Sequence, residues 1–165
     1  MSQKYIFIDR DGVINKDPGG WTEYGYVTVP EDFYMVKGSV EAIKMFTDAG
    51  YKVIIISNQQ GVGKGYFSEE DLKKVTRKME RVVEEGKGKI TRVYYCTHTD
   101  EEDCDCRKPR EGMFLKAKEE LNIESFEGKF YIGDTERDIQ AGRRVGLKTI
   151  FVLSGKNSAE DAKKF

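Results

Sequence analysis

Short, largely apolar runs alternate along the chain with longer amphipathic segments. The apolar runs cover residues 5–8, 53–56, 90–95, 130–132 and 149–153. Runs with few polar positions are typical of strands buried on both faces, as in parallel sheets. The segments between them predict helices over 39–49, 68–86, 112–121 and 139–145. Ser39 is the predicted N-cap of the first, and Ser68 to Asp71 predict a capping box at the second. The pattern predicts an α/β fold: one Rossmann-like domain over 1–165, with a central parallel sheet flanked by helices.

Polar side chains follow four of the predicted strands or the loops that leave them. Asp9 and Asp11 follow the first strand, Ser57 ends the second, Lys108 lies beyond the third and Asp134 follows the fourth. Ligands bind at the carboxyl ends of strands in open parallel sheets, so we expect one shared site. Carboxylates with few protein ligands suit Mg²⁺, while a serine and a lysine can hold phosphate oxygens. An aspartate can act as the nucleophile in such a site.

All cysteine and histidine residues of the chain, which commonly bind metal ions, lie in one loop. Its three cysteines and single histidine are Cys96, His98, Cys104 and Cys106, in the spacing C-x-H…C-x-C. Four such donors suit tetrahedral Zn²⁺ and leave no position for water, so a structural zinc in loop 96–106 is predicted. The clustering argues against a disulfide framework. Buried free cysteines with a surface histidine are the alternative.

Charge and composition argue against nucleic acid and membranes as binding partners. The 165 residues include 28 basic and 29 acidic side chains, with a formal net charge of −1. No overall field would draw this chain to nucleic acid or to a membrane. No apolar run approaches the ~20 residues of a membrane span, and no signal peptide precedes the first strand. We therefore expect a cytoplasmic monomer that acts on a small phosphate ester.

Two loops remain open to more than one interpretation. Residues 15–30 contain several glycines together with Trp21, Tyr24 and Tyr26. They predict either a flap beside the cleft or an aromatic cover for the edge of the core. The glycine-rich segment 61–65 predicts close backbone approach to an anion, although it lacks the ending of a Walker loop.

Together these motifs resemble a known family. D-R-D-G-V at 9–13, S-N-Q at 57–59, R-K-P at 107–109 and G-D-x-x-x-D at 133–138 are similar, in order, to the four motifs of haloacid dehalogenase (HAD) superfamily phosphatases. The resemblance implies that Asp9 attacks phosphorus and that Asp11 is the general acid and base. It implies Mg²⁺ ligation by Asp9, the Asp11 backbone carbonyl and Asp134. Ser57 and Lys108 would stabilise the phosphoryl group. Asp138 is expected either to cap a helix or to serve the metal.

The cysteine loop narrows the resemblance to a small branch without a large cap domain. Members of this branch act on D-glycero-D-manno-heptose 1,7-bisphosphate or on histidinol phosphate. Segments 26–27, 58–70 and 111–113 resemble the heptose type, whereas the five residues between His98 and Cys104 match the histidinol type. The resemblance implies that Arg107 recognises the sugar or its second phosphate, and that Thr135 occupies a substrate-contacting position at which the family usually has lysine or arginine. The expected pocket residues are Asp17, Tyr26, Asn58, Gln59 and Gln60.

Two other classes of protein share part of this pattern. A phospho-acceptor signalling domain also combines aspartate, serine or threonine, and lysine at strand ends, but it places its acceptor on an internal strand. A zinc-stabilised module that binds a phosphorylated polymer, related to DNA-end phosphatases, would need a basic track that this composition does not offer. The sequence therefore favours a phosphatase.

Overall fold

The sheet forms as the apolar runs predict. A computed structural model describes residues 3–165 and contains one five-stranded sheet in the order β3-β2-β1-β4-β5. All neighbouring strands are parallel, which confirms the predicted α/β fold with a parallel sheet. The strands are β1 (Lys4–Ile8), β2 (Tyr51–Asn58), β3 (Ile90–Cys96), β4 (Phe130–Gly133) and β5 (Lys148–Phe151).

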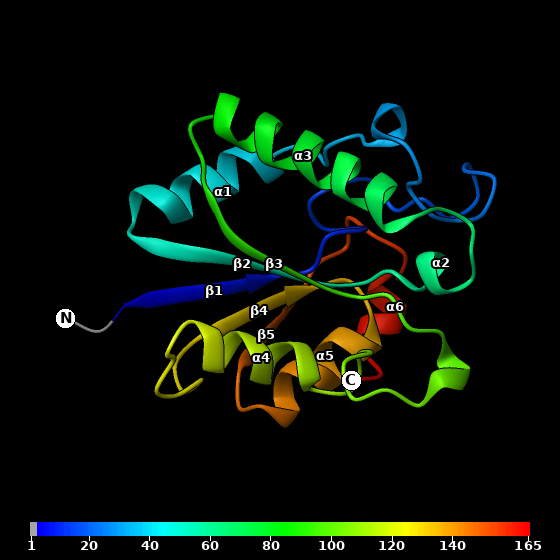
Figure 1. The fold of residues 1–165 in the computed structure, drawn as a ribbon. Helices are drawn as coiled ribbons and strands as arrows, with labels where there is room; N and C mark the ends of the chain where they lie inside the picture. Colours follow the sequence, from blue (N-terminus) through cyan, green and yellow to red (C-terminus); the bar gives the residue numbers. More distant parts are fainter. Residues whose placement is uncertain (1–2) are drawn as a thin grey trace.

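Helices cover both faces of this sheet. Figure 1 shows α1 (Ser39–Asp48) and α3 (Glu69–Glu85) on one face, with α4 (Gly112–Glu120) and α5 (Glu136–Arg144) on the other. Short helical turns lie in the loops between these elements and in the segment after β5. They are η1 (Pro30–Asp32), α2 (Gln60–Gly63), η2 (Asp100–Glu102) and α6 (Ala159–Ala162).

Alternating side chains of the central strands build two cores. In β2, Ile54 and Ile56 join a cluster with residues of α4, whereas Val53 and Ile55 join a cluster with residues of α1 and α3. All of these β2 side chains are fully buried. Each such side chain contributes roughly 1.5–3 kcal/mol through burial, so the strands form a rigid base for the loops at their ends.

The strand order places a crevice at the carboxyl edge. β1 lies between β2 and β4, so the chain reverses its direction of winding at β1, and ligands bind at such switch points. The backbone N–H of Asp9 continues the β1–β4 pairing by donating to the Ile132 carbonyl at 2.9 Å. Asp9 is thus held at the last paired position of the central strand.

One of the three helix N-caps predicted from the sequence is observed, and the other two differ. Ser68 and Asp71 form the predicted capping box of α3. At α1 the N-cap is Gly38, with a φ of +89°, and the Ser39 hydroxyl donates to the Ile14 carbonyl instead. At α5 the N-cap is Thr135, because Asp138 completes a capping box from the first turn.

Candidate functional site

A cleft of about 300 Å³ opens at the carboxyl ends of the strands. Every residue predicted for catalysis or for Mg²⁺ lines it: Asp9, Asp11, Ser57, Lys108 and Asp134. Six of the seven residues predicted to contact substrate line it as well: Asp17, Tyr26, Asn58, Gln60, Arg107 and Thr135. Residues separated by more than a hundred positions in the sequence therefore share one cavity, as the strand-end argument expects.

The Lys108 side chain has four hydrogen-bond partners in the cleft. Its Nζ lies 2.9 Å from Asp9 Oδ1 and 2.6 Å from Asp138 Oδ1, and it also donates to the Tyr131 hydroxyl and the Ile56 carbonyl. The side chain is only 3% exposed. Burial alone would lower the pKa of Lys108, but the charges of Asp138 and Asp9 raise it above its usual value. Lys108 is therefore a fixed cation beside Asp9.

Asp138 has no oxygen left for a metal ion. Its Oδ1 accepts from Lys108 and Tyr131, and its Oδ2 accepts from the Thr135 hydroxyl at 2.8 Å and from the backbone N–H groups of Asp134 and Thr135. Burial would raise the pKa of Asp138, but Lys108 and these donors lower it. Of the two alternatives open from the sequence, the geometry favours the capping role.

Asp9 and Asp134 meet in a way that suits a divalent cation. One carboxylate oxygen from each, with one from Asp138, lie within 4.8 Å of one another. Asp134 Oδ1 is buried without a hydrogen-bond partner in the part of the chain that the structure describes. Burial raises the pKa of Asp134 to about 6, and burial together with the charge of Asp138 raises the pKa of Asp9, against the effect of Lys108. A hard cation would offset these costs, so the residues present fit Mg²⁺.

The segment after β5 completes the Asp134 environment, and the sequence analysis did not find it. The Lys156 backbone N–H donates to Asp134 Oδ2 at 2.9 Å, and the Ser154 hydroxyl donates to the Gly12 carbonyl at 2.8 Å. A Cβ atom at Gly12 or at Gly155 would collide with the Asp134 carboxylate. The close approach of three backbone segments therefore depends on these glycines. In the sequence, the feature that could have indicated this contact is Gly155, shortly after the predicted strand at 149–153.

Asp11 is held on both carboxylate oxygens by side chains behind the cleft. Arg10 donates to both oxygens at 3.0–3.2 Å, Asn15 donates to Oδ1 at 2.9 Å, and Gln59 donates to Oδ2 at 2.8 Å. Arg10 is fully buried; burial would lower its pKa, but Asp11 raises it. These contacts fix the direction of the Asp11 carboxylate. Arg10 and Asn15 were not singled out from the sequence, because nothing local marks a buried arginine.

Gln59 differs from its predicted role. It is fully buried and does not line the cleft, in contrast to the expectation of a substrate contact. Its amide donates to Asp11 Oδ2 and, at 3.0 Å, to the Ser57 hydroxyl. The strand alternation continues past β2, so the side chain after Asn58 turns inward. Gln59 positions the side chains of the site rather than lining it.

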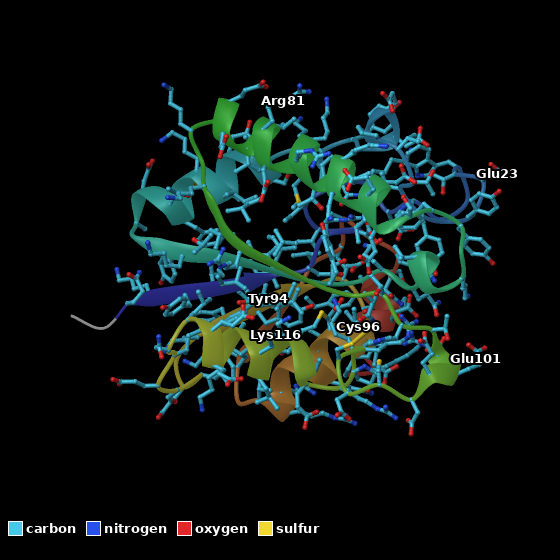
Figure 2. The ribbon with its side chains drawn as sticks, in the orientation of Figure 1. Glu23, Arg81, Tyr94, Cys96, Glu101 and Lys116 are labelled. Carbon is cyan, nitrogen blue, oxygen red and sulfur yellow. A yellow bond between two sulfur atoms is a disulfide. The ribbon has the colours of Figure 1, made fainter. Side chains whose placement is uncertain are left out.

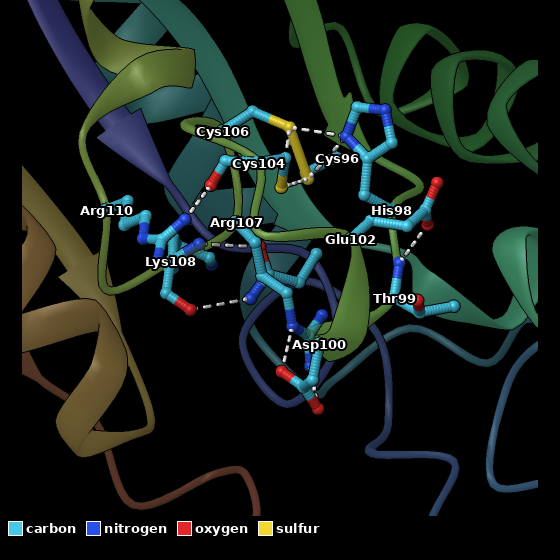
Figure 3. The surroundings of a disulfide bond; sticks show 11 residues. Cys96, His98, Thr99, Asp100, Glu102, Cys104, Cys106, Arg107, Lys108 and Arg110 are labelled. Carbon is cyan, nitrogen blue, oxygen red and sulfur yellow. Dashed lines mark hydrogen bonds and ion pairs between the residues drawn. A yellow bond between two sulfur atoms is a disulfide. The ribbon is translucent and has the colours of Figure 1, made fainter.

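A basic rim lies on the side of the cleft next to the cysteine loop. Arg107 Nε donates to Asp100 Oδ1 at 2.6 Å (Figure 3). This hydrogen bond lowers the pKa of Asp100, and the charges of Arg137 and Lys64 add to the effect. Arg137 and Lys156 also line the cleft, although the sequence analysis did not select them. The cleft therefore combines an acidic floor with a cationic edge.

Part of the cleft wall is aromatic. Tyr24 and Tyr26 line the cleft, and Tyr24 stacks on Tyr66 with 4.7 Å between ring centroids. Trp21 packs on Tyr34 away from this lining. Segment 15–30 thus contains both a wall of the cleft and an aromatic surface cover, the two alternatives that the sequence left open.

The glycine-rich segment after β2 does not form an anion cradle. The Gly63 N–H donates to the Thr97 carbonyl and the Gly65 N–H donates to the Val62 carbonyl. A Cβ at Gly63 would collide with that same Thr97 carbonyl. The glycines instead allow α2 to pack closely against the loop that follows β3.

The predicted zinc ligands gather at the end of β3. Their donor atoms lie within 4.8 Å of one another. Figure 2 marks Cys96 beside yellow sulfur atoms, and Figure 3 shows the cysteines next to the His98 ring. Four of the separations are 3.2–3.7 Å: Cys96–His98, Cys96–Cys104, Cys104–Cys106 and His98–Cys106. A tetrahedron with Zn–S bonds of about 2.3 Å has edges of about 3.8 Å. The donor set therefore fits Zn²⁺.

One contact in this cluster differs from the sequence expectation. Cys96 and Cys106 are joined as a disulfide, with Cys104 free, whereas the clustering argued against disulfides. A disulfide removes two of the four ligands, because zinc binds thiolates. Zinc binding and the disulfide are thus alternative states of the same residues.

Zinc analysis of the reduced protein distinguishes these states. We expect about one Zn²⁺ per chain, and we expect a chelator to lower the unfolding temperature because the loop loses its cross-link. Metal analysis and thermal unfolding measure both quantities. Cys104→Ser removes one ligand and should therefore lower the zinc content and the unfolding temperature, as the chelator does. Metal-free reduced protein of equal stability, or an intact disulfide in reductant, would contradict the zinc assignment.

Comparisons with known proteins agree with these features. A family model described as HAD-hydrolase-like matches residues 105–165. The chain is 38% identical to a D-glycero-beta-D-manno-heptose-1,7-bisphosphate 7-phosphatase of Pasteurella multocida, covering 98% of this chain and 88% of that protein. It is 39% identical to the phosphatase of the same name from Neisseria meningitidis, covering 93% and 79%. A crystal structure of D,D-heptose 1,7-bisphosphate phosphatase from B. bronchiseptica, complexed with magnesium and phosphate, superimposes with a TM-score of 0.89 at 30% identity, covering 98% and 87%.

Proposed function

This chain belongs to the HAD-like phosphatases, and from that premise we propose that it removes the 7-phosphate of D-glycero-D-manno-heptose 1,7-bisphosphate. The observation that carries the proposal is the meeting of Asp9, Lys108 and Asp134 in one cleft, in a chain with this identity to heptose bisphosphate phosphatases. Phosphoryl transfer requires mainly positioning and neutralisation of the phosphate oxygens, and these side chains are suited to both.

In the first step, Asp9 is the nucleophile. A carboxylate oxygen of Asp9 forms a bond to phosphorus while the bond from phosphorus to the sugar oxygen breaks. Protonated Asp11 gives its proton to the departing sugar oxygen. Lys108 and the Ser57 hydroxyl hold oxygens of the phosphoryl group. The products are the dephosphorylated sugar and an aspartyl-phosphate at Asp9.

In the second step, Asp11 acts as the base. It takes a proton from water, the water oxygen bonds to phosphorus, and the bond between phosphorus and Asp9 breaks to release inorganic phosphate. Its hydrogen bonds to Arg10, Asn15 and Gln59 hold the carboxylate in a fixed orientation for this step. Asp9 returns to its starting state.

Mg²⁺ would be held by Asp9, Asp134 and the Asp11 backbone carbonyl. When bound, it neutralises negative charge on the carboxylates and on the phosphoryl oxygens. The buried, unpartnered Asp134 Oδ1 supports this assignment, because a buried oxygen without a partner is costly. Zn²⁺ in loop 96–106 would shape the segment that carries Arg107 and Lys108.

The remaining cleft residues are proposed to select a sugar phosphate. Gln60 lines the cleft, and its Oε1 is buried without a hydrogen-bond partner in the described chain, so it can accept from a sugar hydroxyl. Asp17 supplies a further acceptor and Tyr26 an aromatic face. Arg107 would contact the second phosphate. The monomeric state and the cytoplasmic location stay predictions. Within residues 3–165, no helix has the length and apolar character needed to cross a bilayer.

Histidinol phosphate is the second candidate substrate, because the short spacing between His98 and Cys104 matches that type. A phospho-acceptor signalling domain is the alternative from a different class. The curated relatives carry phosphatase names, which favours hydrolysis.

Specificity constants for three substrates test this proposal. We expect Mg²⁺-dependent phosphate release with the highest kcat/KM on the heptose bisphosphate, because Arg107 has an anion to contact only in that substrate. Histidinol phosphate and an aryl phosphate serve as comparisons. A higher value for histidinol phosphate would overturn the substrate, and absence of release from all three would overturn the enzyme assignment.

A further inference from the structure

The cations that line the cleft differ in what already holds them. Lys108 is bonded to two buried carboxylates, and Arg107 is paired with Asp100. Lys156 donates only its backbone N–H, to Asp134 Oδ2, and its ammonium group has no partner within 3–165. Lys156 does not line the neighbouring hollow that contains both Arg107 and Arg137. Arg137 is exposed, and its side chain forms no hydrogen bond or ion pair with other residues in 3–165, yet it lines the cleft. Its guanidinium is thus available to an anion in the cleft.

The first turn of α5 explains why Arg137, and not its neighbour at the cap, can supply this contact. The Thr135 hydroxyl donates to Asp138 Oδ2 at 2.8 Å and accepts from the Asp138 backbone N–H. Thr135 cannot turn toward a ligand without breaking the helix cap. Arg137 lies in the same turn, and its side chain takes no part in the helix cap. It is therefore the long, donor-rich side chain that α5 presents to the cleft.

A second hollow places Arg137 next to Arg107. This hollow, of about 310 Å³, shares Arg107, Lys108 and Arg137 with the cleft. The other arginines on its wall, Arg110 and Arg144, are each paired with a carboxylate. The junction of the two hollows therefore has two guanidinium groups, of which only the one on Arg107 is already paired.

We propose that Arg137 is a specificity-determining residue that binds, with Arg107, the second phosphate of a sugar bisphosphate whose other phosphate lies at Asp9. A phosphate monoester carries about −1.5 to −2 charges at pH 7, and Asp100 already balances part of the Arg107 charge. A second guanidinium is needed to complete the neutralisation, and arginine binds phosphate through paired N–H groups. This inference rests on the proposed function.

The test compares two substrates that differ only in the second phosphate. The ratio measured is kcat/KM for heptose 1,7-bisphosphate divided by kcat/KM for heptose 7-phosphate. Arg137→Ala should lower this ratio about tenfold, mainly by raising KM for the bisphosphate. Arg137→Lys should restore part of the ratio. Added salt should lower the wild-type ratio more than that of Arg137→Ala, because an exposed charge is screened.

Arg143→Ala is the matched control, since Arg143 is exposed on the same helix but lines neither hollow. It should leave the ratio unchanged. A ratio for Arg137→Ala that stays within about twofold of wild type, or equal losses on both substrates, would overturn the role of Arg137 and leave the proposed function intact. A wild-type protein inactive on both substrates would overturn both.

Discussion

Asp9→Asn is expected to lower phosphate release by about 10⁴-fold or more, because it removes the nucleophile. The substitution keeps the size of the side chain, and an asparagine oxygen can still accept the hydrogen bond from Lys108 that now goes to Asp9 Oδ1. The loss should therefore appear in kcat while the protein stays folded. Steady-state phosphate release at saturating substrate and Mg²⁺ measures the effect.

The control for this variant is Asp48→Asn. Asp48 is an exposed carboxylate at the end of α1, just before β2 begins and thus at the opposite edge of the sheet. It should retain wild-type activity. Far-ultraviolet circular dichroism and zinc content should match for both variants. Substantial turnover by folded Asp9→Asn would eliminate Asp9 as the attacking group.

Lys108→Met is expected to destabilise the fold by about 3–5 kcal/mol, because it leaves buried carboxylates without their cation. Lys108 bridges Asp9 and Asp138, and both acids are almost fully buried. Urea unfolding without added Mg²⁺ measures the change. The loss should diminish as the pH falls below about 4. The pKa of Asp138 is lowered in the wild type, although burial opposes this, so the stabilisation from that pair disappears once Asp138 is protonated.

A double-mutant cycle isolates the ion pair. Asp138→Asn in the Lys108→Met background removes one of the two unpaired charges and keeps a side chain that can accept the Thr135 hydrogen bond. The double variant should be less destabilised than the sum of the two single variants. Additive losses would show that Lys108 and Asp138 act independently.

The strands and the residues at their ends were predictable because both depend on local sequence. Buried strands have dense apolar runs. Asp9 and Ser57 follow such runs directly, and Asp134 follows one after a single glycine. The topology of parallel sheets then brings their ends together. The T-x-x-D pattern from Thr135 to Asp138 also marked the α5 cap, but Asp138 itself was interpreted as the capping residue.

Other parts of the site depend on tertiary structure and have no local signal. Arg10 is fully buried behind Asp11, although a sequence pattern ordinarily indicates exposure for arginine. Lys156 contributes a backbone N–H, which any residue could supply. Asp138 meets Lys108 only after α5 folds against the sheet. The sequence therefore indicated which groups meet in the cleft, but not the contacts that orient them.

The central claim is that the phosphoryl group passes to Asp9 within this cleft. The direct measurement is mass spectrometry of the peptide that contains Asp9, after acid quenching of Asp11→Asn protein that has reacted with substrate. Without the base at position 11, breakdown of the aspartyl-phosphate slows and the adduct accumulates. We predict a phosphoryl adduct on Asp9; a turnover-competent protein with no adduct there, or with the adduct on another residue, would contradict the account.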